Sequence, residues 1–202
     1  MKKEWQVEPD IGSCPRDIEG IVIGDEGCIH RALDSRLIPW VKRAQKKGLA
    51  VRYVTPLVPN KYIEELFYFI FQLAKITKIK ITFNDYGMLD RCRELIEKER
   101  IIPVVGRIIT RSITDCPWYE ELLKHEKLDL AVAVIGSNLV HSAKWEVLRK
   151  YKIREIEVNM NQGLNLADLH KNNLAVTCYS SEYFGVSRKS MLQRQMAGVE
   201  TA

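Results

Sequence analysis

The sequence predicts an α/β fold in which parallel strands alternate with helices. Seven short runs rich in β-forming residues start near positions 20, 50, 79, 101, 128, 153 and 173. These starts lie about 20 to 30 residues apart, which is the size of one strand–helix unit. Most of the stretches between them carry apolar residues at helical spacing, so we expect helices to cover the sheet. A barrel and an open doubly wound sheet both fit this alternation.

The expected strands are short runs such as KIKITF, which alternates as a half-buried strand does. In order they are Gly20–Gly24, Leu49–Val54, Lys78–Phe83, Ile101–Gly106, Leu128–Gly136, Ile153–Val158 and Asn173–Tyr179. Trp5–Val7 is a candidate eighth strand. The polar stretch after it contains Gly12 and Pro15 and has no room for a full helix. A barrel would therefore have seven or eight strands, and whether it is complete at the N-terminus stays open.

Three apolar stripes predict the main helices. The first stripe consists of Leu33, Leu37, Trp40, Val41 and Ala44. The second, stronger stripe consists of Ile63, Leu66, Phe67, Ile70, Phe71 and Ala74. The third follows Asn84 and Asp85 and consists of Met88, Leu89, Cys92, Leu95 and Ile96. Shorter helices are expected at Trp118–Lys124 and Lys144–Tyr151.

The composition favours one folded domain. The chain has 202 residues, of which 46% are hydrophobic, enough to fill a single core. No linker or low-complexity segment divides it. We assign residues 1–19 to an N-terminal segment, residues 20–186 to a single barrel domain and residues 187–202 to a C-terminal tail or helix. An apolar stripe in this tail would dock on the barrel or on a partner protein.

Charge and cysteine content argue against several classes of protein. The formal net charge is +5, which is mildly basic and weak support for nucleic-acid binding. No apolar run approaches the roughly 18 residues of a membrane span, and the N-terminus is charged, so we expect a cytoplasmic protein. The five cysteines are odd in number and contain no CxxC pair. They therefore argue against a disulfide framework or a zinc ribbon.

Polar residues gather where the expected strands end. In barrels and open sheets alike, ligands bind beyond the carboxyl ends of the strands. Strand exits also become loops and are polar in any α/β protein, so each residue has a purely structural interpretation as well. In chain order the exits carry Asp25, Glu26 and Cys28; Thr55; Asn84 and Asp85; Arg107; Ser137 and Asn138; Asn159, Asn161 and Gln162; and Tyr179, Ser180 and Glu182.

Two of these exits leave alternatives open. Asn84 and Asp85 separate a strand from a helix, where a short polar side chain caps the helix and a carboxylate favours its positive end. The same two residues would also border a ligand. The Arg107 guanidinium would bind a carboxylate or phosphate through two parallel hydrogen bonds. Alternatively, it would pair with Asp85 or with another carboxylate at the exits.

Four segments carry a resemblance to a known family. They are GIVIGDEGCIHR (Gly20–Arg31), ITFNDYGML (Ile81–Leu89), IPVVGRIIT (Ile102–Thr110) and IEVNMNQGL (Ile156–Leu164). In order and spacing they resemble the collagenase-like "U-thirty-two" peptidase superfamily, and the similarity covers the chain from Gly20 to Arg188. The closest likeness is to a short, barrel-only branch that takes part in oxygen-independent hydroxylation of ubiquinone precursors, with relatives that modify ribosomal or transfer RNA. The resemblance implies a TIM-like barrel whose strand exits surround a pocket.

The resemblance also raises the question of an iron–sulfur cluster. Many superfamily members hold one by four cysteines, one at an early strand exit and three near the chain's end. Cys28 matches the early ligand, but no cysteine follows Cys178, and Glu182 and Arg188 occupy the late region. Cluster ligation needs several converging thiolates, of which Cys28 and Cys178 supply two, and Cys14 a third only by folding over the barrel mouth. We expect no four-cysteine cluster and leave the cofactor unassigned.

Peptide hydrolysis is the historical activity of this superfamily. A thiol peptidase would need Cys28 as a thiolate within hydrogen-bond reach of His30 or His141. A cysteine at the end of a buried strand is otherwise a small core residue. The sequence has no GxSxG, HExxH, GxGxxG or Walker pattern, which argues against serine and zinc hydrolases and against dinucleotide or ATP enzymes.

Two functional hypotheses follow. In the first, the chain is an enzyme or enzyme subunit that modifies a small molecule, peptide or RNA by hydroxylation or hydrolysis. In the second, it is a cluster-less binding or scaffolding subunit that pairs with a partner barrel or a second copy. The missing late cysteines favour the second, and the polar strand exits favour the first. The catalytic candidates are Cys28, Asp85, Arg107 and Glu182, and the substrate-binding candidates are Glu26, Asn84, Asn138, Asn159, Gln162 and Arg188.

Overall fold

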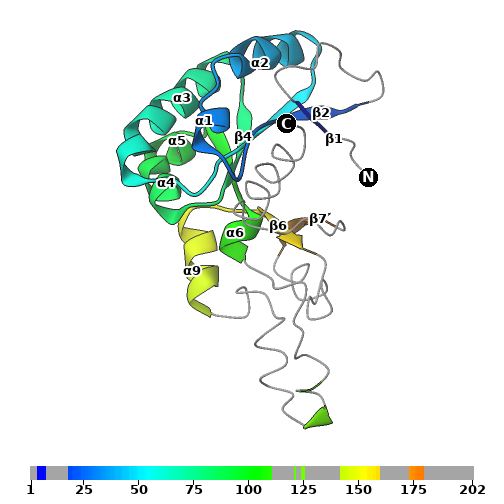
Figure 1. Ribbon diagram of the computed structural model, residues 1–202, viewed down its shortest axis with the longest axis vertical. Coiled ribbons are helices and arrows are strands. Elements are labelled where there is room, and N and C mark those ends of the chain that lie inside the picture. Colours follow the sequence, from blue (N-terminus) through cyan, green and yellow to red (C-terminus); the bar gives the residue numbers. More distant parts are fainter. Residues whose placement is uncertain are drawn as a thin grey trace, which may run out of the picture.

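The computed structural model describes residues 4–7, 18–110, 121, 124–125, 142–159 and 173–179. Its strands form one seven-stranded parallel sheet in the order β1-β2-β3-β4-β5-β6-β7. Neighbours in this sheet are also neighbours along the chain, and the sheet curls into a half-barrel (Figure 1). The predicted α/β fold with parallel strands is therefore confirmed. The strands are β1 (Glu4–Gln6), β2 (Gly20–Gly24), β3 (Ala50–Val54), β4 (Ile79–Phe83), β5 (Ile101–Val105), β6 (Glu155–Asn159) and β7 (Ala175–Tyr179).

Helices cover the outside of the curl, where α2, α3, α4 and α5 follow one another along the sheet (Figure 1). Of the described helices, none has the length and the apolar character needed to cross a membrane. The helices are α1 (Ile29–Ala32), α2 (Leu37–Lys46), the 3₁₀ helix η1 (Asn60–Tyr62), α3 (Ile63–Ile76), α4 (Tyr86–Arg91), α5 (Arg93–Glu97), α6 (Arg107–Thr110) and α9 (Ser142–Lys150).

The core lies between the sheet and these helices. Strand residues alternate between the two faces of a sheet, so every second residue of each strand packs against the helices. Tyr53 shows the contact in detail, because its hydroxyl donates a hydrogen bond to the Ala32 carbonyl at 2.7 Å and its ring packs against Phe69. The buried strand residues of this outer face include Ile21, Ile23, Val51, Tyr53, Ile79, Ile81, Phe83, Ile156 and Val158.

The N-terminal segment contains a strand of the sheet. β1 lies parallel to β2, with Glu4 opposite Gly20 and Gln6 opposite Val22. Trp5 contacts Trp40 of α2 edge to face at a centroid distance of 5.7 Å. The candidate eighth strand at Trp5–Val7 is thereby confirmed as part of the sheet.

The second apolar stripe was only partly assigned correctly. The α3 residues that are buried are Leu66, Phe69, Ile70 and Leu73. Phe67 and Phe71 are half-buried and stack on each other at 6.4 Å, with Arg91 above Phe67 and Lys75 above Phe71. The segment LFYFIF is apolar on every side, so periodicity alone does not select the face that packs on the sheet.

The remaining elements agree with the prediction in part. The helix after Asp85 is divided at Cys92 into α4 and α5 rather than continuous, because Cys92 leaves the helical conformation at φ −88° and ψ 5°. The expected helix at Lys144–Tyr151 is α9. β5 pairs directly with β6. The expected strand at Leu128–Gly136 and the C-terminal stripe lie outside the described residues, as does the helix at Trp118–Lys124 apart from positions 121 and 124.

Candidate functional site

Asn84 joins three strand exits at the carboxyl edge of the sheet. It is buried, and its Nδ2 donates to the Thr55 carbonyl after β3 at 2.9 Å. Its Oδ1 accepts a hydrogen bond at 3.1 Å from the Ile108 backbone N–H, which follows β5. A Cβ on Gly106 would overlap this carboxamide, so a larger residue there would force the Asn84 side chain to move. The Asn84 side chain, a candidate ligand group, thus holds the β3, β4 and β5 exits together.

Asp85 caps the helix that follows β4. Its Oδ1 accepts a hydrogen bond from the Met88 backbone N–H at 2.9 Å, and its backbone is extended, as an N-cap residue requires. The side chain is half-buried at the strand exit. The capping role expected for Asp85 is therefore present in the structure.

The loop between β2 and α1 carries a second group of predicted residues. Gly24 has φ +87°, and a Cβ there would overlap the Val54 carbonyl, so glycine permits the close turn. Asp25 accepts hydrogen bonds from the backbone N–H groups of Gly27 and Cys28 at 2.7 and 2.9 Å. Its second oxygen pairs with Arg31 at 3.2 Å. Asp25 thus folds the loop, and Cys28 enters α1 as a half-buried free thiol.

Glu26 and Arg107 form an ion pair across the strand exits. Glu26 follows β2 and Arg107 opens α6 after β5, so the pair spans the ends of the two strands between them. The Arg107 side chain is 14% exposed and the Glu26 side chain 36%. The sequence left Arg107 either to bind an anionic ligand or to pair with a carboxylate at the exits. The structure shows such a pair, and the described partner is Glu26 rather than Asp85.

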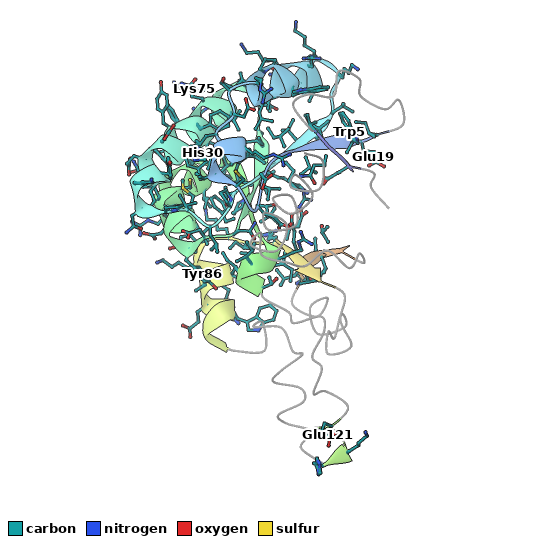
Figure 2. The ribbon with its side chains drawn as sticks, viewed as in Figure 1. Trp5, Glu19, His30, Lys75, Tyr86 and Glu121 are labelled. Atoms are coloured by element: carbon teal, nitrogen blue, oxygen red, sulfur yellow. The ribbon has the colours of Figure 1, made fainter. Side chains whose placement is uncertain are left out.

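The proposed thiol–histidine pair is not formed in the described part of the chain. The exposed His30 ring packs edge-on against Tyr62 at 5.6 Å. Figure 2 shows His30 on α1, one of the helices that follow the strand exits. Within the described residues no hydrogen bond joins His30 to Cys28. His141 lies outside them.

The structure does not test the metal candidates Cys28 and Cys178 as a pair. Cys28 follows β2 and Cys178 belongs to β7, with β3 to β6 between those strands in the sheet. Cys178 is described by its backbone alone, and Cys14 lies outside the described residues. The described side chains contain no group of three or more His, Cys, Asp or Glu that could hold a metal ion.

Several predicted site residues have no described side chain. Asn159 ends β6 and is described by its backbone only. The others lie outside the described residues altogether: Asn138, Gln162, Glu182 and Arg188.

A charged cluster on the inner face of the half-barrel was not predicted from the sequence. Arg52 on β3 is 4% exposed, and its guanidinium contacts three carboxylates. Its Nη1 lies 2.8 Å from Glu157 and its Nη2 2.6 Å from Glu155, both on β6, and its Nε lies 2.9 Å from Glu4 on β1. One side chain therefore joins β3 to strands on both sides that are not its neighbours in the sheet.

Two residues of β4 complete this cluster. Lys80 pairs with Glu155 at 2.5 Å, and the Thr82 hydroxyl donates to Glu157 at 2.7 Å. Together the six residues contribute two cations and three carboxylates. A signal for this cluster was present in the sequence, because KIKITF and EIEVN each place two charges on alternate positions and AVRYV places one arginine in the middle of a strand.

The charges in the cluster shift one another's titration. Burial by itself lowers the pKa of Arg52, but the nearby carboxylates of Glu157, Glu155 and Glu4 outweigh it and raise the pKa above the ordinary arginine value. Burial acts to raise the pKa of Glu155. The hydrogen bond from Lys80 and the charge of Arg52 outweigh burial there, and the pKa of Glu155 is lowered. Both shifts favour the ionised forms of Arg52 and Glu155.

Comparison with known proteins found no relative of this chain. No protein-family model, no curated protein and no solved structure matches the chain.

Proposed function

We propose that the chain is a TIM-like, incomplete barrel of the collagenase-like "U-thirty-two" peptidase superfamily. In this proposal it acts as an enzyme or enzyme subunit on a small molecule, peptide or RNA, whose anionic group binds at the strand exits. The observation that carries the proposal is the Glu26–Arg107 ion pair across the β2 and β5 exits. Ligands of α/β barrels bind at this edge of the sheet, and the described parts of the motifs that resemble the superfamily lead into it.

The chemistry of Arg107 supports binding of an anion. Arginine presents a planar fork of N–H donors that matches two oxygens of a carboxylate or phosphate. Burial of most of this side chain strengthens its interaction with an anion, because less water competes for the donors. Arg107 would bind and orient the substrate. Cys28 and Asp85, at the β2 and β4 exits, remain the candidates for nucleophilic attack and proton transfer.

The test measures binding of three anions of known chemistry: acetate, N-acetylglycine and inorganic phosphate. Wild type and the Arg107→Lys variant are titrated by calorimetry at constant ionic strength, and circular dichroism checks that the variant is folded. Lysine keeps the charge but loses the fork. A charge-assisted hydrogen bond contributes about 1.5–3 kcal/mol, so we expect at least one probe to bind about 10- to 100-fold more weakly to the variant. Equal affinities would argue against the proposal.

A second candidate function is a scaffolding role with a partner. Within the described sheet, β1 and β7 each have one neighbouring strand and so form its edges. Strand edges carry backbone donors and acceptors that can pair with another chain. Light scattering after size exclusion, over a tenfold range of concentration, tests pairing with a second copy. A dimer mass would support this candidate, and a monomer mass throughout would exclude self-association.

A further inference from the structure

We infer that Glu26 is an internal occupant of the Arg107 anion site, and that the site takes a carboxylate ligand that binds by displacing Glu26. The inference rests on the proposed function and deepens it, because it names the ligand class and the residue that competes with the ligand. A glutamate side chain ends in the same planar group as a carboxylic acid or a peptide C-terminus. The pair shows that a carboxylate oxygen reaches the Arg107 Nη2 at the strand exits.

Arg107 is the fixed half of this pair. The residue before it, Gly106, donates its backbone N–H to the Phe83 carbonyl at 2.8 Å. The residue after it, Ile108, donates to Asn84 at 3.1 Å. Three positions further along α6, the Thr110 hydroxyl donates to the Glu157 carbonyl at 2.8 Å. The backbone around the guanidinium is therefore held by β4 and β6, and it does not depend on Glu26.

Glu26 is the displaceable half. Its loop is folded by Asp25, which accepts both local backbone hydrogen bonds and pairs with Arg31. In the described part of the chain, the hydrogen bond and the ion pair of the Glu26 carboxylate both go to Arg107. The Glu26 side chain is 36% exposed, and Gly27 beside it is exposed as well. The carboxylate can therefore rotate towards solvent while the loop keeps its internal hydrogen bonds.

The energy of the pair sets the size of the effect. A partly exposed ion pair contributes at most about 1 kcal/mol, which corresponds to about fivefold in a binding constant. A ligand that must displace such a competitor binds more weakly by the same factor. Removing the charge of Glu26 should therefore increase affinity for a carboxylate about two- to fivefold. Removing the fork of Arg107 should instead weaken carboxylate binding.

The experiment compares four proteins: wild type, Glu26→Gln, Arg107→Lys and Glu94→Gln. Each is titrated with acetate, as a free acid, and with N-acetylglycine, as a mimic of a peptide C-terminus. Glu94→Gln is the matched control, because it removes one ion-paired glutamate from α5, which leads into the opposite end of β5. It changes the net charge as Glu26→Gln does. Thermal unfolding verifies that each protein is folded, and Glu26→Ala replaces Glu26→Gln if the latter is not.

The outcomes separate this inference from the proposed function. Tighter binding by Glu26→Gln, with wild-type affinity in Glu94→Gln and weaker binding in Arg107→Lys, supports both. The probe that gains more affinity tells a free acid from a chain terminus. Unchanged affinity in Glu26→Gln, with loss in Arg107→Lys, overturns the inference alone. Equal binding by wild type and Arg107→Lys, or no binding by any of the four proteins, overturns both.

Discussion

Replacing Arg52 with methionine tests how much the charged cluster contributes to stability. Methionine has a similar length and no charge, so the change leaves Glu157, which is 1% exposed, and the half-buried Glu155 without the cation between them. Removing one partner of a buried ion pair typically costs about 3–5 kcal/mol, because the remaining charge is left without compensation. In a chain of this size each kcal/mol shifts the melting temperature by about 2–4 °C, so we expect a decrease of about 6–20 °C.

The assay is urea unfolding followed by tryptophan fluorescence, together with calorimetry. Lys98→Met is the control, because Lys98 pairs with Glu94 on the surface of α5 and both side chains are largely exposed. The free energy of unfolding of this control should fall by less than about 0.5 kcal/mol. A double variant, Arg52→Met with Glu157→Gln, should recover part of the loss. The reasoning is refuted if Arg52→Met costs no more than the surface control.

Three further predictions concern other described residues. The pKa of Glu155 is lowered in the folded chain, so its contribution is complete above its unfolded pKa near 4.5 and is lost as the pH falls through the folded value. The difference in unfolding free energy between wild type and Glu155→Gln should therefore shrink below pH 4.5, as measured by urea unfolding across pH. Asp85→Ala removes the hydrogen bond to Met88 and should cost about 0.5–2 kcal/mol, whereas Asp85→Asn, another good cap, should cost less in the same assay. Burial raises the pKa of Cys92 to about 12, so iodoacetamide at pH 8 should leave Cys92 unmodified in the native protein and alkylate it in urea, as mapped by mass spectrometry.

Local patterns in the sequence predicted the elements of the fold well. Strands such as Gly20–Gly24 and the apolar face of α2 follow from the spacing of their residues. The spacing of residues in the sequence did not distinguish a barrel wall from a doubly wound sheet. That choice depends on which strands meet across the inner face, where Arg52 contacts residues about one hundred positions away. Hydrophobic periodicity carries no information about such pairs.

The site was predictable to a similar degree. The sequence placed Asn84, Asp85 and Arg107 at strand exits, and the structure places all three there. Their partners were not predictable, because Glu26 and Arg107 are 81 residues apart in the chain. The sequence also left Asp85 as a possible partner of Arg107, whereas in the structure the Asp85 carboxylate accepts the Met88 N–H. The capping role of Asp85 was thus predictable from the sequence, whereas the role of Asn84 in joining strand exits emerges only from the contacts of the folded chain.

The inner charged cluster has a consequence for the order of folding events. The strands pair in chain order, so β1 to β5 can assemble from contacts between successive units. The bonds from Arg52 to Glu155 and Glu157 join residues 103 and 105 positions apart, and they form only once β6 is in place. Closing such a long loop is slow, so these bonds belong to the last steps of folding. Substitutions at Arg52 should then mainly accelerate unfolding and leave the folding rate nearly unchanged.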